Sequence, residues 1–150
     1  MTKKFTPPQF VKALQRARDN VKRDGLRKAA LAGGFVIEGY GKVNAMTTFN
    51  NVTGNLANSI QTQLVSATAK RAETHVGPTA IYGRIQELGG TIFPRNATRL
   101  HWVDEEGKHH SAVSVTLPAR PYMEPAVTEH VPDIAGAVAE SIRQTVEGSI

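Results

Sequence analysis

Three of the five histidines lie close together in the chain, and histidine is the residue type here best suited to metal binding or acid–base catalysis. His109 and His110 are adjacent, so on a strand their side chains would point to opposite faces and could not share one ion. If His101 lies across a hairpin from one of them, two ligands meet. Zinc needs three or four ligands, and the spacing supplies no third. We therefore expect no metal site, and a metal-dependent hydrolase using these three histidines is the least favoured hypothesis.

Other catalytic patterns are missing from the sequence. There is no cysteine, which excludes thiolate nucleophiles, disulfides and cysteine-ligated zinc. No Gly-x-Ser-x-Gly segment and no phosphate-binding loop ending in Gly-Lys-Ser/Thr occurs. Glu105 and Glu106 lie in a predicted turn beside Gly107, where solvation opposes the burial that tunes a catalytic carboxylate. The sequence therefore predicts a protein that is not an enzyme and uses no cofactor.

The first 28 residues are strongly basic. They hold nine lysines and arginines and two aspartates, whereas the remainder of the chain has nine basic and eleven acidic residues. Several of the cations recur on one helical side at steps of three, four and seven residues. Such a side can track the phosphates of a nucleic acid, contact an acidic protein ring, or simply face solvent. The candidate partner or DNA contacts are Lys12, Arg16, Lys22, Arg23 and Arg27.

This basic segment lacks the features of sequence-specific nucleic-acid recognition. No aromatic residues are interleaved with the cations for base stacking, and no helix-turn-helix or zinc-finger pattern accompanies them. Contact with nucleic acid would therefore be non-specific, and it remains one of the alternatives.

Apolar spacing predicts helices at both ends of the chain. Thr6 followed by Pro7-Pro8 is typical of a helix start, and apolar residues then recur at helical spacing to about Val43. Gly25 weakens the middle of this long helix, and the pair Gly33-Gly34 marks a kink or a point of close packing. A second amphipathic helix follows Pro125, with a break near Val131 and a cleaner helix from Asp133 onwards.

Between the helices, alternating polar and apolar residues predict strands. A helical turn over residues 55–60 precedes a hairpin of residues 60–69 and 71–76, after which Gly77-Pro78 ends the strand. A short helix over 80–88 stops at Gly89-Gly90, and a strand follows over 91–94. Residues 100–103 and 111–117 form a second hairpin, and the prolines of 118–121 predict an extended connector.

These elements predict an α+β fold with a long N-terminal helix, a small antiparallel β-sheet with a short inserted helix, and a C-terminal amphipathic helix. The length of 150 residues fits a single domain, divided into a basic helical arm over 1–45 and an α+β body over 46–150. No run of 18 apolar residues occurs, so no membrane contact is expected. The basic N-terminus is not followed by an apolar stretch, so we expect a protein made in the cytoplasm rather than secreted.

Three separated passages place turn formers, glycines and aromatic residues in a fixed order. The first passage, residues 53–60, reads TGNLANSI. The second runs from Val76-Gly77-Pro78 through Tyr82-Gly83 to a Glu-Leu-Gly-Gly segment at 87–90. The third, residues 118–126, reads PARPYMEPA and precedes the last helix. We expect four side chains of the last two passages to build the fold or an interface: Glu87, Arg120, Tyr122 and Met123.

In this order and spacing the passages resemble the minor tail-component family of tailed bacteriophages, also called neck or tail-completion proteins. The resemblance covers residues 53 to 150, with the N-terminal helix consistent in position. Gly83 stands where the family usually has alanine, Gly90 where threonine is common, and Glu124 where a basic residue is frequent. The last difference puts in doubt any charge-based contact at that position.

The resemblance implies a structural protein of the virion, located at the head–tail junction. Its partners would be further copies of itself in a ring of six or twelve, the phage connector or adaptor, and a tail terminator or tail-tube protein. The surfaces expected to make contacts are the basic helix and the hairpin of residues 96–110. Two alternatives stay open: a tail terminator, and a non-specific nucleic-acid-binding protein that uses the basic N-terminal helix.

Overall fold

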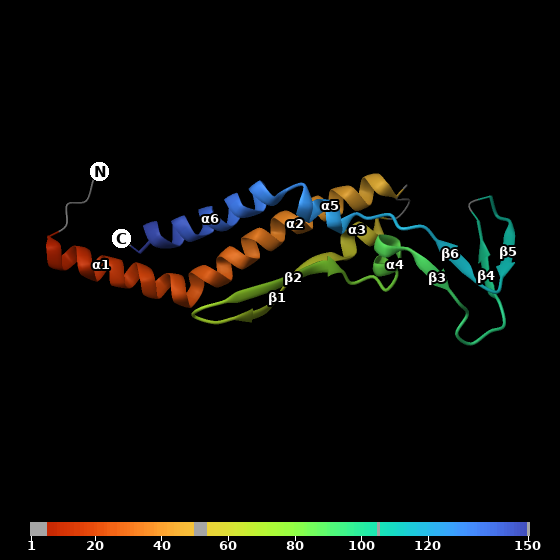
Figure 1. Ribbon diagram of the computed structural model, residues 1–150, viewed down its shortest axis with the longest axis horizontal. Coiled ribbons are helices and arrows are strands. Elements are labelled where there is room, and N and C mark those ends of the chain that lie inside the picture. Colours follow the sequence, from red (N-terminus) through yellow and green to blue (C-terminus); the bar gives the residue numbers. More distant parts are fainter. Residues whose placement is uncertain (1–5, 50–53, 105, 150) are drawn as a thin grey trace.

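The computed structural model describes residues 6–49, 54–104 and 106–149. The molecule is elongated, with the N-terminal helix at one end and two small β-ribbons at the other (Figure 1). The described elements are α1 (Pro7–Asn20), η1 (Val21–Gly25), α2 (Leu26–Thr48), α3 (Asn55–Ser59), β1 (Ile60–Ala67), β2 (Ala72–Pro78), α4 (Gly83–Leu88), β3 (Gly90–Ile92), β4 (Leu100–Val103), β5 (His109–Ala112), β6 (Val115–Leu117), α5 (Met123–Thr128) and α6 (Val131–Glu147). The predicted α+β class is confirmed.

The predicted long helix is present and extends to Thr48, five residues beyond the expected end. The Gln9 side chain accepts a hydrogen bond from the Thr6 backbone N–H (3.0 Å), which satisfies a donor at the helix start. The weak point expected at Gly25 is a single π-helical turn, η1, that joins α1 to α2 without a break. Gly25 is buried there beside Thr145 of α6, so a glycine suits the turn because it admits the neighbouring helix.

Helix α2 is the central layer, with the β1–β2 hairpin on one side and α6 on the other (Figure 1). Residues 26–45 therefore lie inside the body, whereas the sequence placed them in the arm. The pair Gly33-Gly34 makes this arrangement possible, because a Cβ on Gly33 would lie 2.9 Å from Val138 and a Cβ on Gly34 2.5 Å from Thr62. Of the two predicted roles, close packing is the one observed.

A first test concerns Gly34. The substitution Gly34→Ala is expected to destabilise the fold by about 1–3 kcal/mol, because the methyl group overlaps Thr62 in a packed interface. Gly39 lies on the same helix, and a Cβ added there would have no neighbouring atom within 4 Å, so Gly39→Ala should instead stabilise by up to about 1 kcal/mol through helix propensity. Urea denaturation of both variants measures the difference. Equal shifts in the two proteins would contradict the proposed close contact.

The β1–β2 hairpin is antiparallel, and its register pairs Ile60 with Pro78. The strand ends at Gly77-Pro78 as expected, but it includes these two residues instead of stopping at Val76, because the two-stranded sheet leaves an edge where a missing N–H is tolerated. Glu38 of α2 holds the hairpin: its carboxylate accepts the Thr62 backbone N–H (2.8 Å) and the Lys42 ammonium (2.6 Å). The hydrogen bond from Lys42 lowers the pKa of Glu38.

The second predicted hairpin differs from the expectation. Residues 109–112 form β5 and pair with β4, whereas residues 115–117 form β6 and pair with β3. The single strand predicted over 111–117 is therefore split between two ribbons that project from the body (Figure 1). The alternation of polar and apolar residues over 111–117 is the same whether these residues form one long strand or parts of two short strands, so the sequence could not distinguish the two.

The C-terminal helices follow the prediction closely. Helix α5 ends at Thr128 and α6 begins at Val131, so the helical segment is interrupted close to Pro132, as predicted. Pro132 lies in the first turn of α6, where its missing N–H leaves no helical hydrogen bond unmade. One face of α6 packs against α2, and no residue of α6 is buried.

The buried core is small for the length of the chain. Among the described residues, nine apolar side chains are buried, and five of them form one cluster: Ala45, Tyr122, and Leu56, Ala57 and Ile60 of the α3–β1 corner. The accessible surface is 10720 Å², whereas a compact protein of 16.2 kDa exposes about 7,500 Å². The elongated shape thus leaves an excess of about 3,000 Å² of surface relative to a compact monomer.

Candidate functional site

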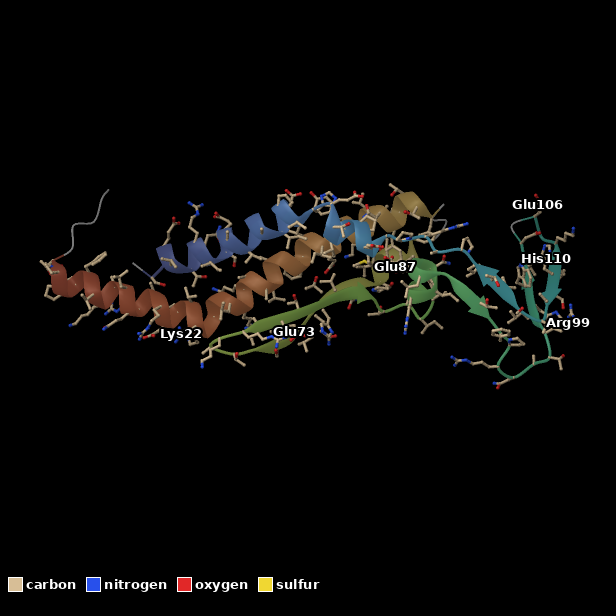
Figure 2. The ribbon with its side chains drawn as sticks, in the orientation of Figure 1. Lys22, Glu73, Glu87, Arg99, Glu106 and His110 are labelled. Carbon is tan, nitrogen blue, oxygen red and sulfur yellow. The ribbon has the colours of Figure 1, made fainter. Side chains whose placement is uncertain are left out.

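The carboxylate of Glu87 caps the start of helix α5 from a distant part of the chain. It accepts backbone N–H hydrogen bonds from Tyr122 (2.7 Å), Met123 (3.0 Å) and Glu124 (2.9 Å). These are donors that a helix N-terminus leaves without partners, and a negative charge is favourable beside them. Figure 2 shows Glu87 near the middle of the molecule, where α4 approaches α5. Glu87 therefore fixes the connector that precedes the last two helices.

Tyr122 is fully buried at the same junction. Its hydroxyl donates a hydrogen bond to the Gly83 carbonyl (3.2 Å), and its ring meets Phe49 edge-on with centroids 5.8 Å apart. Burial, together with the nearby Glu87 carboxylate, raises the pKa of Tyr122 to about 12. The Asn44 side-chain amide donates to the Tyr122 carbonyl (3.0 Å), which ties α2 to the connector. Tyr122 is the anchor of this junction.

The other two predicted motif residues differ in their surroundings. Met123 is half-buried, and its sulfur lies close enough to Gly41 of α2 that a Cβ there would be 2.7 Å away. Arg120 donates its backbone N–H to the Gln86 carbonyl (2.9 Å), but its side chain is exposed. Within the described residues, the guanidinium of Arg120 makes no ion pair. Three of the four motif side chains thus join elements of one chain, and Arg120 faces outward.

The predicted basic contacts all lie on α1, η1 and the start of α2, and all are exposed. Arg23 pairs with Asp24 (3.1 Å), whereas the side chains of Lys12, Arg16, Lys22 and Arg27 make no ion pair with any described residue. Lys22 lies where α1 and α2 meet, near the tip of the β1–β2 hairpin (Figure 2). Lys22 and Arg23 line a shallow hollow there together with residues 67–69 of the hairpin. Asp19 lines the same hollow, so this part of the surface carries one acidic residue beside its two cations.

The histidines do not converge on one point. His101 pairs across the hairpin with Ser111 rather than with another histidine, so the conditional arrangement of two histidines opposite each other is not formed. His110 instead contacts the Asp104 carboxylate (2.6 Å) and stacks on Trp102, and the hydrogen bond from His110 lowers the pKa of Asp104. In the part of the chain that the structure describes, no three histidine, aspartate or glutamate side chains are placed to hold a metal ion.

A polar link between α2 and α6 was not foreseen from the sequence. The rings of Tyr40 and His130 stack with centroids 3.3 Å apart, and the Tyr40 hydroxyl donates to the Asp133 carboxylate (2.8 Å). The hydrogen bond to Asp133 raises the pKa of Tyr40. No local pattern marks this contact, because the two segments are about ninety residues apart.

Exposed large apolar side chains occur along the whole described molecule, including both of its ends. On α1, Phe10, Val11 and Leu14 are each about half exposed. At the opposite end, an apolar hollow of about 770 Å³ lies between the α4 region and β3. Its lining residues are Ile81, Tyr82, Ile85, Thr91, Ile92, Phe93, Pro94 and Arg95. Ile81 is 99% exposed, which is unusual for a large apolar side chain.

No described helix is both long and apolar enough to cross a membrane. Comparison of the chain with protein-family models, with curated proteins and with solved structures finds no match.

Proposed function

We propose that this protein is a structural subunit of the head–tail junction of a tailed bacteriophage, and that it acts by assembling into a ring with further copies of itself. In this proposal it catalyses no reaction and holds no cofactor. Its neighbours in the virion are a connector or adaptor protein on the head side and a tail terminator or tail-tube protein on the tail side.

The observation that carries the proposal is the large exposed surface. The excess of about 3,000 Å² over a compact monomer falls within the roughly 2,000–5,000 Å² that obligate assemblies bury. Large apolar side chains are exposed at both ends, as expected when different surfaces of one subunit meet neighbouring copies. A catalytic protein would instead require a cleft with converging polar groups.

The passages behind the family resemblance provide a second line of support. Residues 55–60, the α4 region and the connector around Tyr122 are far apart in sequence, but they meet at one buried junction. Thr53 lies outside the described residues. Because the three passages depend on one another for packing, their joint occurrence is more informative than each short motif alone.

The function is tested by composition and genetics. The protein should be found in purified virions, and a phage lacking the gene should release heads and tails that fail to join. Electron microscopy of the deletion lysate, with complementation from a plasmid as control, measures both. Normal tailed particles without this protein would contradict the proposal. A tail terminator, the alternative within the virion, predicts tails of irregular length instead of unjoined tails of normal length.

The projecting β4–β5 hairpin offers a specific test. Its described contacts are almost entirely within the hairpin, so replacing residues 95–113 by a short Gly-Ser loop should leave the melting temperature of the body within a few degrees. If the hairpin contacts a neighbouring virion protein, the same variant should fail to complement the deletion phage. Full complementation would show that this ribbon is not a required contact surface.

A non-specific DNA-binding function remains a second candidate, because several cations of the basic helix make no ion pair with a described residue. It predicts duplex binding that weakens about tenfold or more between 50 and 200 mM salt. Fluorescence anisotropy with a labelled duplex measures this, and no binding at low salt would exclude it.

A further inference from the structure

Two faces of this molecule carry opposite charge. Residues 7–28 have a net charge of +5, whereas residues 123–149 have a net charge of −4. Arg143 is the single lysine or arginine of residues 123–149. The five acidic residues of that segment are Glu124, Glu129, Asp133, Glu140 and Glu147. A protein with two such faces can bind a second copy of itself, the basic face of one subunit meeting the acidic face of the next.

The basic face is open within the described part of the subunit. Helix α1 extends past the C-terminal end of α6, so its first turns have no neighbour from the described chain on that side (Figure 1). Four cations of α1, η1 and the start of α2 are exposed and make no ion pair with a described residue: Lys12, Arg16, Lys22 and Arg27. Phe10 and Leu14, 52% and 49% exposed, lie on the other side of α1 from Lys12 and Arg16, because residues two apart on a helix point about 200° apart. The surface around these cations is therefore polar, and an acidic protein surface is its electrostatic complement.

The acidic residues of α6 lie along one side of the helix, and the first of them, Asp133, accepts a hydrogen bond from Tyr40 of α2. Asp133, Glu140 and Glu147 are seven residues apart, so they form one stripe along α6 at intervals of about 10.5 Å. Val138 and Ile134 lie on the opposite side of the helix, within contact distance of Gly33 on α2. Arg16 and Arg23 are also seven residues apart, so the two stripes have similar spacing.

Each acidic residue of this stripe has a partner within the subunit, and Asp133 contacts Tyr40 (2.8 Å) and His130 (3.4 Å). Arg143 pairs with Glu140 (2.8 Å) and Glu147 (3.5 Å), and hydrogen bonds from Gln144 and Arg143 lower the pKa of Glu140. These pairs are exposed, and exposed pairs contribute little to stability, so cations of another subunit can replace or extend them.

We propose that the basic face of α1 and η1 in one subunit packs on the acidic stripe of α6 in a second copy of this chain. The inference rests on the proposed ring and names its subunit interface. The two contacting surfaces are different, so each subunit can both give and receive the contact, and the arrangement closes into a ring when the rotation between copies permits. Charge complementarity brings the two faces together, sets the register and excludes wrong pairings.

Charge reversal with rescue tests this interface. One variant carries Lys12→Glu, Arg16→Glu and Lys22→Glu, and a second carries Glu140→Lys and Glu147→Lys. The full-length proteins are compared by sedimentation velocity over a range of concentrations, and circular dichroism confirms that each variant is folded. We expect the wild type to associate. We expect the dissociation constant for self-association of each variant to be at least about tenfold higher than that of the wild type. An equimolar mixture of the two variants is expected to regain association, because each has one reversed and one natural face.

Matched controls make the result specific. The double variant Arg95→Glu, Lys108→Glu makes the net charge more negative, as the basic-face variant does, but at the opposite end of the molecule. Its dissociation constant for self-association should remain within about threefold of the wild-type value. A monomeric wild type, unchanged association in either reversed variant, or failure of the folded variants to associate when mixed would each overturn the interface. So would a basic-face variant that loses only duplex binding, because DNA would then be the partner.

The interface and the proposed function fail in different ways. If wild-type protein associates but the reversed variants associate equally well, the ring stands and another surface forms it. If the protein is missing from virions, the function is wrong whatever the sedimentation shows.

Discussion

Replacing Tyr122 with alanine is expected to destabilise the protein by about 3–5 kcal/mol, the range observed when a large buried aromatic side chain is removed. Tyr122 is fully buried and is one of the two largest side chains with almost no exposed surface. It lies against Phe49 and completes the core at the α3–β1 corner. Few other large side chains are buried among the described residues, so little neighbouring material is available to fill the cavity.

Chemical denaturation monitored by far-ultraviolet circular dichroism measures this loss. Tyr82→Ala is the matched control, because that side chain is 41% exposed and should lose less than about 1 kcal/mol. Domains of this kind are stable by only about 5–15 kcal/mol, so the Tyr122→Ala protein should be near the limit of folding at 37 °C. Similar shifts in the two variants would mean that Tyr122 is not the anchor of the junction.

The conservative variant Tyr122→Phe isolates the hydroxyl group. Loss of the hydrogen bond to the Gly83 carbonyl should cost about 0.5–1.5 kcal/mol at neutral pH. The pKa of Tyr122 is about 12 in the fold against an ordinary value of 10.0, so the unfolded chain loses this proton first. The stabilising effect of the protonated hydroxyl is therefore complete below pH 10 and is lost as the pH rises from 10 towards 12.

The difference in denaturation midpoint between wild type and Tyr122→Phe should consequently shrink above pH 10. Tyr40 also has a raised pKa, but it is present in both proteins and its contribution cancels in the difference. A difference that stays constant from pH 8 to the highest pH at which both proteins fold would show that Tyr122 is accessible to solvent.

Replacing Glu87 with alanine is expected to produce the second largest effect, a loss of about 2–4 kcal/mol. Its carboxylate accepts three backbone N–H groups at the start of α5, and hydrogen bonds to charged groups are worth more than neutral ones. Alanine leaves these partly buried donors without an acceptor. The change also releases the connector that places α6 on α2, so the two C-terminal helices should lose protection from hydrogen exchange before the hairpin does.

Glu87→Gln separates charge from geometry. The amide keeps one acceptor oxygen of similar reach, so we expect roughly half of the loss seen with alanine. Glu129→Ala provides the control, because Glu129 is exposed at the end of α5 and makes no ion pair with a described residue. If Glu87→Ala is no more destabilising than Glu129→Ala, the three hydrogen bonds do not hold the connector in solution.

Elements that depend on local chemistry could be predicted from the sequence. They include the long helix, the α3 turn, the first hairpin, the short helix ending at Gly89 and the break before Val131, because spacing, caps, glycine and proline act within a few residues. The basic character of the N-terminal segment and the acidic character of the C-terminal segment are likewise properties of composition. Glycines 33 and 34 were marked as a special point, but the sequence left open whether they kink the helix or admit a neighbour.

Contacts between residues far apart in the chain required the tertiary structure. It showed that Gly33 and Gly34 admit α6 and the hairpin, that residues 109–112 and 115–117 pair with different strands, and that Glu87 caps a helix thirty-five residues away. No local rule predicts such contacts, because each depends on how the whole chain closes loops and packs its layers. The same holds for the charged faces: the sequence supplied the charges, and packing of α6 on α2 left its acidic stripe exposed while α1 extended beyond it.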